Sequence, residues 1–172
     1  LRRSPTLTVD PTMAYVAGYM LRHTDVPEDW FDNGAIYRDE VPKADALSHS
    51  FYGNDIPGEF YLHLTQHLRI FVDAQSASEV FISAQTPYDE APTTWYNLSL
   101  NGYEAKADQF RFVCLDETIN STPVLTCNVY QVYGKAFSLI YVNIDGRYIT
   151  IDQVQKVLEQ VDQKLSFFKA TP

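Results

Sequence analysis

Glycine, cysteine and basic residues are all scarce in this sequence, and each shortage excludes a class of function. The seven glycines do not cluster, so no P-loop or dinucleotide-binding fingerprint is present. No apolar run approaches the roughly 18 residues that span a bilayer. With 13 Lys and Arg against 22 Asp and Glu, the formal net charge is -9, which disfavours binding to nucleic acid and to anionic lipid.

The two cysteines, Cys114 and Cys127, fall on two predicted neighbouring strands that are separated by a turn-rich loop. We expect them to form a disulfide, which would contribute about 3 kcal/mol by restricting the unfolded chain. The alternative is a pair of free thiols in the core. The sequence has no C-x-x-C motif and no second pair of metal ligands, so zinc binding and thioredoxin-like chemistry are unsupported.

The rest of the composition is that of an ordinary globular domain. Of the 172 residues, 45% are hydrophobic and 14% are aromatic, and the twelve Tyr and ten Phe favour a sheet-rich fold. The chain begins at Leu1, which is compatible with a signal peptide or lipid anchor removed upstream. We expect residues 1–10 to form a flexible leader and residues 11–172 to form a single α+β domain.

Local patterns predict an antiparallel β-sheet with helices packed on one face, including an N-terminal and a C-terminal helix. The first helix is expected to begin at Pro11 and to end near His23. Thr150 and Gln153 have the spacing of a capping box and predict the last helix. The other elements are expected at these ranges: strands at 35–38, 60–72, 108–115, 124–133 and 136–144, and a helix at 73–84.

The expected strand at 60–72 has the clearest alternation in the chain. Its even-numbered residues are mostly apolar and its odd-numbered residues are mostly polar, which is typical of an antiparallel strand with one covered face. Its length predicts a bend or a bulge near Gln66. An apolar stripe on the last helix should pack on this strand, so we expect four residues to be buried together: Leu68, Ile70, Val154 and Leu158.

The sequence predicts no catalytic residue, no metal site and no cofactor. His63 and His67 have the spacing of helical metal ligands, but on a strand they lie roughly 13 Å apart. The segment 143–152 superficially suggests part of a calcium loop, but Tyr141 would occupy its first ligand position. The acidic residues between 25 and 40 are interpreted as a solvated loop rather than as paired catalytic carboxylates.

An aromatic loop is the strongest candidate for a binding site. The expected loop at 85–96 contains Tyr88, Trp95 and Tyr96 together with two prolines, which stiffen it. Rigid aromatic side chains on a loop supply contact area at a low entropic cost. The alternative is that these side chains only cover an edge of the core.

Three segments resemble the extracellular sensor domains of bacterial receptor-type Ser/Thr kinases and related secreted lipoproteins. The first is Asp25-Val26-Pro27-Glu28-Asp29-Trp30, which is similar to a Leu-Pro-x-x-Trp segment after the opening helix of that family. The second is the run from Leu68 to Ala77, and the third is the arrangement from Cys127 to Leu165. The resemblance implies the fold and an extracytoplasmic compartment, whether secreted, periplasmic or lipid-anchored at the cell surface.

The leading hypothesis for function is a non-catalytic, sensor-like domain that binds a small molecule or a protein between its sheet and its helices. A structural or protein-interaction domain of a secreted or lipid-anchored protein is the alternative. A hydrolase with a dispersed active site is a third hypothesis, although the sequence has no nucleophile motif such as G-x-S-x-G.

Overall fold

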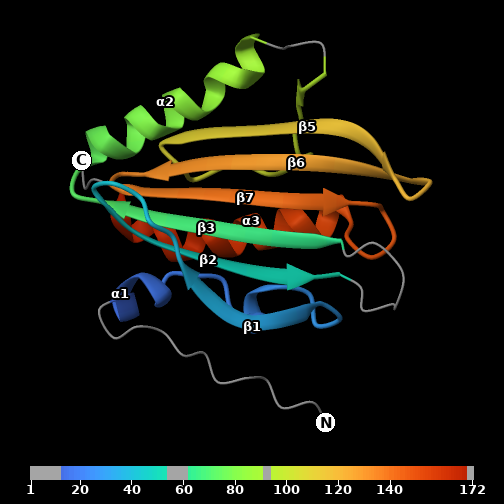
Figure 1. The fold of residues 1–172 in the computed structure, drawn as a ribbon, viewed down its shortest axis with the longest axis horizontal. Coiled ribbons are helices and arrows are strands. Elements are labelled where there is room, and N and C mark those ends of the chain that lie inside the picture. The colour runs from blue at the N-terminus through green and yellow to red at the C-terminus, as the bar shows by residue number, and fades with distance from the viewer. Residues whose placement is uncertain (1–12, 54–61, 91–93, 170–172) are drawn as a thin grey trace.

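A computed structural model describes residues 13–53, 62–90 and 94–169, and its core is a seven-stranded antiparallel sheet (Figure 1). The chain is therefore an α+β protein with an antiparallel sheet, as the sequence predicts. The strands are β1 Phe31–Arg38, β2 Ala44–Tyr52, β3 His63–Phe71, β4 Tyr96–Asn97, β5 Gln109–Ile119, β6 Thr122–Tyr133 and β7 Ala136–Ile144. The helices are α1 Ala14–Ala17, α2 Ala74–Glu90 and α3 Ile151–Leu165, with short 3-10 turns at η2 His23–Asp25 and η3 Ser166–Phe168.

The strands lie in the order β1-β2-β3-β7-β6-β5-β4. Tight turns join β5 to β6 and β6 to β7, and Gly134 at the second of these turns has a φ of 53°, which glycine adopts at little cost. Asp145 ends β7 with a turn, because its Oδ1 accepts the backbone N–H groups of residues 147–149. Thr150 and Gln153 then form the predicted capping box at the start of α3.

The sheet has two faces, and each carries its own hydrophobic cluster. One face, called here the α3 face, includes Leu68, Cys127 and Ile140, which belong to the same cluster as the buried residues of α3. The four residues predicted to be buried together all belong to it: Leu68, Ile70, Val154 and Leu158. The N-terminal residues Val16, Met20 and Leu21 complete the same cluster.

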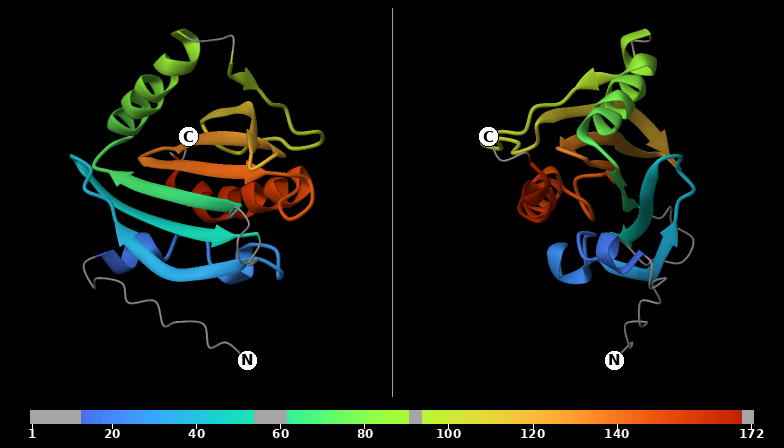
Figure 2. Two further views of the ribbon diagram at one scale, coloured as in Figure 1. Left: turned by 45° about the vertical axis from the view of Figure 1, so that its right-hand side comes forward. Right: turned by 90° about the vertical axis from the view of Figure 1, so that its left-hand side faces the viewer.

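The helix α2 departs from the expectation that all helices pack on one face. Its Ala77 joins Phe71, Tyr130 and Phe137 in a second cluster, and Tyr130 alternates along β6 with residues of the first cluster. Because successive side chains of a strand point to opposite faces, α2 lies on the other side of the sheet, called here the α2 face (Figure 2). The sheet is therefore covered on both sides, but only in part on the α2 face.

Several expected boundaries were wrong. The expected helix from Pro11 to His23 is reduced in the described residues to α1 and η2, and residues 1–10 lie outside the described part of the chain. The strand β2 falls in a stretch that was predicted to be mainly loop. No bulge occurs at Gln66, since β3 pairs without interruption with both of its neighbours. Instead, Gln66 is fully buried, and its Oε1 accepts the backbone N–H of Leu21 at 2.7 Å.

The disulfide between Cys114 and Cys127 is confirmed. The two residues lie directly opposite each other on β5 and β6, with their Cα atoms 4.1 Å apart. Both side chains are fully buried in the cluster of the α3 face. The bond therefore ties together two neighbouring strands inside the core.

Candidate functional site

The structure brings together two of the three aromatic residues predicted to form a site. Tyr88 lies on α2, which continues through Pro87 to Glu90, so the expected loop at 85–96 is wrong over its first part. The ring of Trp95 contacts that of Tyr88 edge-on, with centroids 5.0 Å apart. The hydroxyl groups of Tyr88 and Tyr130 are 2.6 Å apart, and burial, followed by this hydrogen bond, raises the pKa of Tyr130.

Tyr96 lies on the other side of the sheet. It pairs directly opposite Cys114, whose side chain is on the α3 face, and directly opposite residues share a face. Its hydroxyl group approaches Asp116 at 3.4 Å. Tyr96 therefore does not join Tyr88 and Trp95, whose contacts are with the α2 face.

A set of polar and aromatic side chains occupies the half of the α2 face that α2 leaves open. We call it the polar patch, and it consists of Ser50, Tyr52, His63, Thr65, Thr126, Asn128, Tyr141 and Asn143. Four of these form one row across the sheet through direct cross-strand pairs: Ser50, Thr65, Tyr141 and Asn128. In Figure 1 this half of the sheet is on the right, where no described helix passes in front of β2, β3 and β7.

Hydrogen bonds connect the members of the polar patch to one another. Asn143 donates through Nδ2 to Thr126 Oγ1 at 3.1 Å, and Thr126 donates to Glu117 Oε2 at 2.5 Å. Ser50 and Thr65 share a hydrogen bond of 2.8 Å. Asn143 is fully buried, and its Oδ1 has no hydrogen-bond partner among the described groups. A buried polar atom without a partner costs about 1–3 kcal/mol.

Three rings lie next to one another in the polar patch and come from three neighbouring strands. The ring centroids of Tyr52 and His63 are 6.2 Å apart, and those of His63 and Tyr141 are 5.1 Å apart. All three side chains are partly buried. The rings therefore form a continuous aromatic surface beside the hydroxyl and amide groups.

Tyr88 and Arg111 form the border of the polar patch next to α2. Asn128 donates to Tyr88 Oη at 2.8 Å, which joins the predicted aromatic residue to the patch. The Arg111 guanidinium lies over the Tyr88 ring at 5.8 Å and pairs with Asp89 at 2.9 Å. The patch contains no Lys or Arg of its own, so it offers hydrogen bonds and ring surfaces rather than positive charge.

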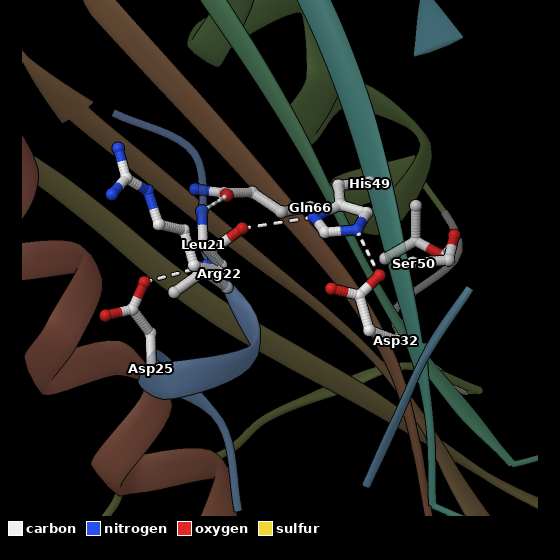
Figure 3. Close-up of polar contacts among 8 residues, drawn as sticks. Leu21, Arg22, Asp25, Asp32, His49, Ser50 and Gln66 are labelled. Carbon is white, nitrogen blue, oxygen red and sulfur yellow. Dashed lines mark hydrogen bonds and ion pairs between the residues drawn. The ribbon is translucent and has the colours of Figure 1, made fainter. Parts of the chain in front are cut away.

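A buried Asp–His pair lies on the α3 face and has the composition of a catalytic dyad. His49 Nε2 is 2.8 Å from Asp32 Oδ1, and His49 Nδ1 is 3.1 Å from the carbonyl oxygen of Leu21 (Figure 3). Both ring nitrogens are therefore engaged, and the ring is fully buried. Ser50, the next residue on β2, points to the opposite face, so this serine is not placed to act as a nucleophile.

Neither a metal centre nor a spanning segment emerges among the described residues. No three His, Cys, Asp or Glu side chains there gather to hold an ion. His67, considered for metal binding from its spacing, lies 3.0 Å from Asp39 instead. Along the same residues, no helix is both long and apolar enough to cross a membrane.

The largest pocket among those described has a volume of about 700 Å³ and opens at the end of the sheet beside the start of α3. Its lining combines apolar side chains such as Val124 and Ile151 with Asp116, Glu117 and Asp145. Asp145 already holds the turn before α3 through its Oδ1. The pocket is therefore acidic.

No protein-family model, curated protein or solved structure matches this chain. The resemblance to bacterial sensor domains consequently rests on the sequence segments alone.

The polar patch was missed in part because two of its eight residues lie on an unexpected strand, β2. The alternation along β3 did place His63 and Thr65 on a face of their own. The sequence predicts a loop at Ser50 and Tyr52, because Asp, Ser and His follow one another at close spacing in β2. The available signal was the matching alternation of β2 and β7, whose polar residues pair with those of β3.

Proposed function

We propose that this chain is a non-catalytic, ligand-binding domain that works outside the cytoplasm, and that the polar patch is its binding surface. The observation that carries the proposal is the contiguous surface formed by Tyr52, His63 and Tyr141, flanked by hydroxyl and amide groups. A sheet face that only contacts water is usually covered by long charged side chains, and it does not need a network of aromatic, hydroxyl and amide groups. The buried disulfide supports a location in an oxidising compartment. A sensor-like role would agree with the resemblance described above.

The chemistry of the patch favours a neutral ligand that is rich in hydroxyl groups, such as a saccharide. The partly buried Ser50, Thr65 and Asn128 supply donors and acceptors that suit hydroxyl groups, while the aromatic rings supply flat apolar surfaces for the C–H faces of a sugar ring. An anionic ligand is disfavoured by the absence of Lys and Arg from the patch and by the net charge of -9. A lipid tail is disfavoured because the patch has no aliphatic side chain.

A matched pair of tyrosine variants tests this proposal. Tyr141→Ala removes a ring from the polar patch, while Tyr96→Ala removes a ring from the opposite side of the same sheet. Isothermal titration with neutral oligosaccharides of glucose, mannose and N-acetylglucosamine should show that Tyr141→Ala weakens binding about tenfold or more, a loss of about 1.4 kcal/mol. Tyr96→Ala should leave the affinity within about twofold of the parent protein.

Two results would contradict the proposal. One is the absence of saturable binding for every saccharide class at millimolar concentration. The other is an equal loss of affinity in both variants, which would place the contact elsewhere. Melting curves of both variants are the control, because Tyr141 is partly buried and its removal must not unfold the domain.

A further inference from the structure

The short strand β4 covers only part of the outer side of β5. Its two residues pair with Val113 and Cys114, whereas β5 continues to Ile119. Along residues 115–119, β5 therefore has a neighbour on the β6 side and, among the described residues, no strand on the other side. We call this unpaired side of residues 115–119 the free edge. In Figure 1 it extends from β4 to the tip of the β5–β6 hairpin.

Backbone groups of the free edge point outward at alternate residues. The C=O of Phe112 accepts the Leu98 N–H on the outer side of β5. Because successive residues of a strand turn their backbone groups to opposite sides, the N–H and C=O groups of Asp116 and Thr118 also point outward. No described residue forms a backbone hydrogen bond with these groups. Such a row of unpaired donors and acceptors is a template for a further strand.

The pocket at the end of the sheet opens beside the free edge. Its wall is mainly apolar, and Asp116 and Asp145 are among its lining residues. Asp116 lies on the α3 face, because it is two residues from Cys114 on the same strand. A residue of an added strand directly opposite Asp116 would have its side chain on this face as well, next to the pocket.

Carboxylates around the pocket define the charge of a suitable partner. Asp116 accepts only a long hydrogen bond from Tyr96, at 3.4 Å through Oδ1, and Asp145 uses its Oδ1 for the turn before α3. The Oδ2 atoms of both have no partner among the described residues, so each can accept a hydrogen bond from a cation. A second copy of this chain at the same edge would bring Asp116 and Glu117 close to their own counterparts, and like charges on paired strands repel each other. With a net charge of -9, the protein instead favours a basic partner.

We propose that the free edge binds an extended, basic segment of a partner protein as an additional strand, with a Lys or Arg of that segment opposite Asp116. Backbone hydrogen bonds to Asp116 and Thr118 hold the segment in place. The aliphatic stem of the basic side chain covers the apolar wall of the pocket, and its charged end meets the carboxylates of Asp116 and Asp145. The pocket lies on the α3 face and the polar patch on the α2 face, so this interaction does not depend on the proposed saccharide site.

A charge exchange at Asp116 tests the proposal. The probes are a capped heptapeptide in which Val and Lys alternate and a matched peptide with Glu in place of Lys. In an NMR titration of the full chain, the Val–Lys peptide should shift the amide signals of residues 115–119 and bind at least about tenfold more tightly than the Val–Glu peptide. Asp116→Lys should reverse this preference. Glu159→Lys is the control, because it changes the net charge equally from an exposed position on α3 outside the pocket, and it should change both affinities less than about twofold.

Methylation of the peptide backbone separates strand addition from simple charge attraction. An added strand pairs through only one of its edges, so methylating the nitrogens of either the odd or the even residues of the Val–Lys peptide should abolish binding, while methylating the other set should preserve it. Equal binding of both methylated peptides would overturn the proposal. Equal affinities for the Lys and Glu peptides, shifts confined to other parts of the sheet, or no saturable binding at millimolar concentration would also overturn it. If Asp116→Lys fails to fold, the methylated pair decides alone.

Discussion

Short polar side chains occupy the polar patch, and their size is part of their chemistry. Thr126 and Asn143 have few rotatable bonds, so little conformational entropy is lost when they are held by hydrogen bonds. Side chains held in this way need no further ordering when a ligand binds to the proposed site. The neighbouring rings of His63 and Tyr141 are similarly fixed by the pairing of β3 with β7.

Asp162 is the residue whose environment differs most from the sequence-based expectation. A charged side chain on an amphipathic helix is expected to face water, but Asp162 is only 2% exposed. Its carboxylate accepts hydrogen bonds from Tyr133 at 2.5 Å, from Tyr103 at 2.9 Å and from the Lys106 N–H at 3.2 Å. Three donors therefore make this burial tolerable, and none of them is signalled by local sequence.

We predict that Tyr133→Phe lowers the free energy of unfolding by about 1–3 kcal/mol at pH 7, because buried Asp162 loses a donor. Burial, followed by the Asp162 hydrogen bond, raises the pKa of Tyr133. A raised pKa favours the folded state below the ordinary tyrosine pKa of about 10, and this contribution is lost as the pH rises further. The difference in the free energy of unfolding between the variant and the parent protein should therefore shrink above about pH 10.

Urea unfolding at neutral and alkaline pH measures this effect. Tyr96→Phe is the control, because the Tyr96 side chain is exposed and its hydrogen bond to Asp116 is long, at 3.4 Å. A Tyr133→Phe variant as stable as the parent at pH 7 would mean that the other two donors suffice for Asp162.

The elements that the sequence predicted well are those with local signals. The capping box of Thr150 and Gln153 and the turn at Gly134 depend on residues a few positions apart. The strand β2 depends instead on its pairing with β3 along nine positions, and its own sequence of Asp, Ser and His resembles a loop. The helix α2 continues through Pro87, and Tyr88 just beyond it packs on Tyr130, a contact that local propensity cannot indicate.

The pair of strands β5 and β6 gives a second stability prediction. Replacing both Cys114 and Cys127 by alanine should lower the free energy of unfolding by about 3 kcal/mol, because the bond restricts the unfolded chain. The hairpin itself should persist, since eleven residue pairs hold it. Urea unfolding of the oxidised protein and the double variant measures the difference.

The mass of the alkylated protein checks the bond directly. Both sulfur atoms lie in the fully buried core, so the native protein should resist reductant and take up alkylating reagent only after unfolding and reduction. Two alkylated thiols in unreduced, unfolded protein would contradict the bond and would weaken the case for an oxidising compartment.

The whole molecule combines a sheet face that is covered over most of its described strands with one that is covered over about half of them. On the α3 face, the N-terminal segment and α3 bury the sheet, while on the α2 face a single helix covers one half (Figure 2). Tyr88 and Trp95 lie beside α2 at the border of the polar patch. The sequence predicts these two aromatic residues as part of a site, but it does not predict the patch next to them. A site assembled from four strands cannot be derived from any one of them.

The most direct test of the account is to map the ligand on the protein surface by NMR. Titration of the oxidised, isotope-labelled protein with the tightest-binding neutral oligosaccharide should shift amide and side-chain signals of the polar patch, above all those of Thr65, Asn128 and Tyr141. Signals around Tyr96 and on α3 should remain in place. Perturbations confined to the α3 face or to the acidic pocket at the end of the sheet, with the patch unchanged, would contradict the proposed site.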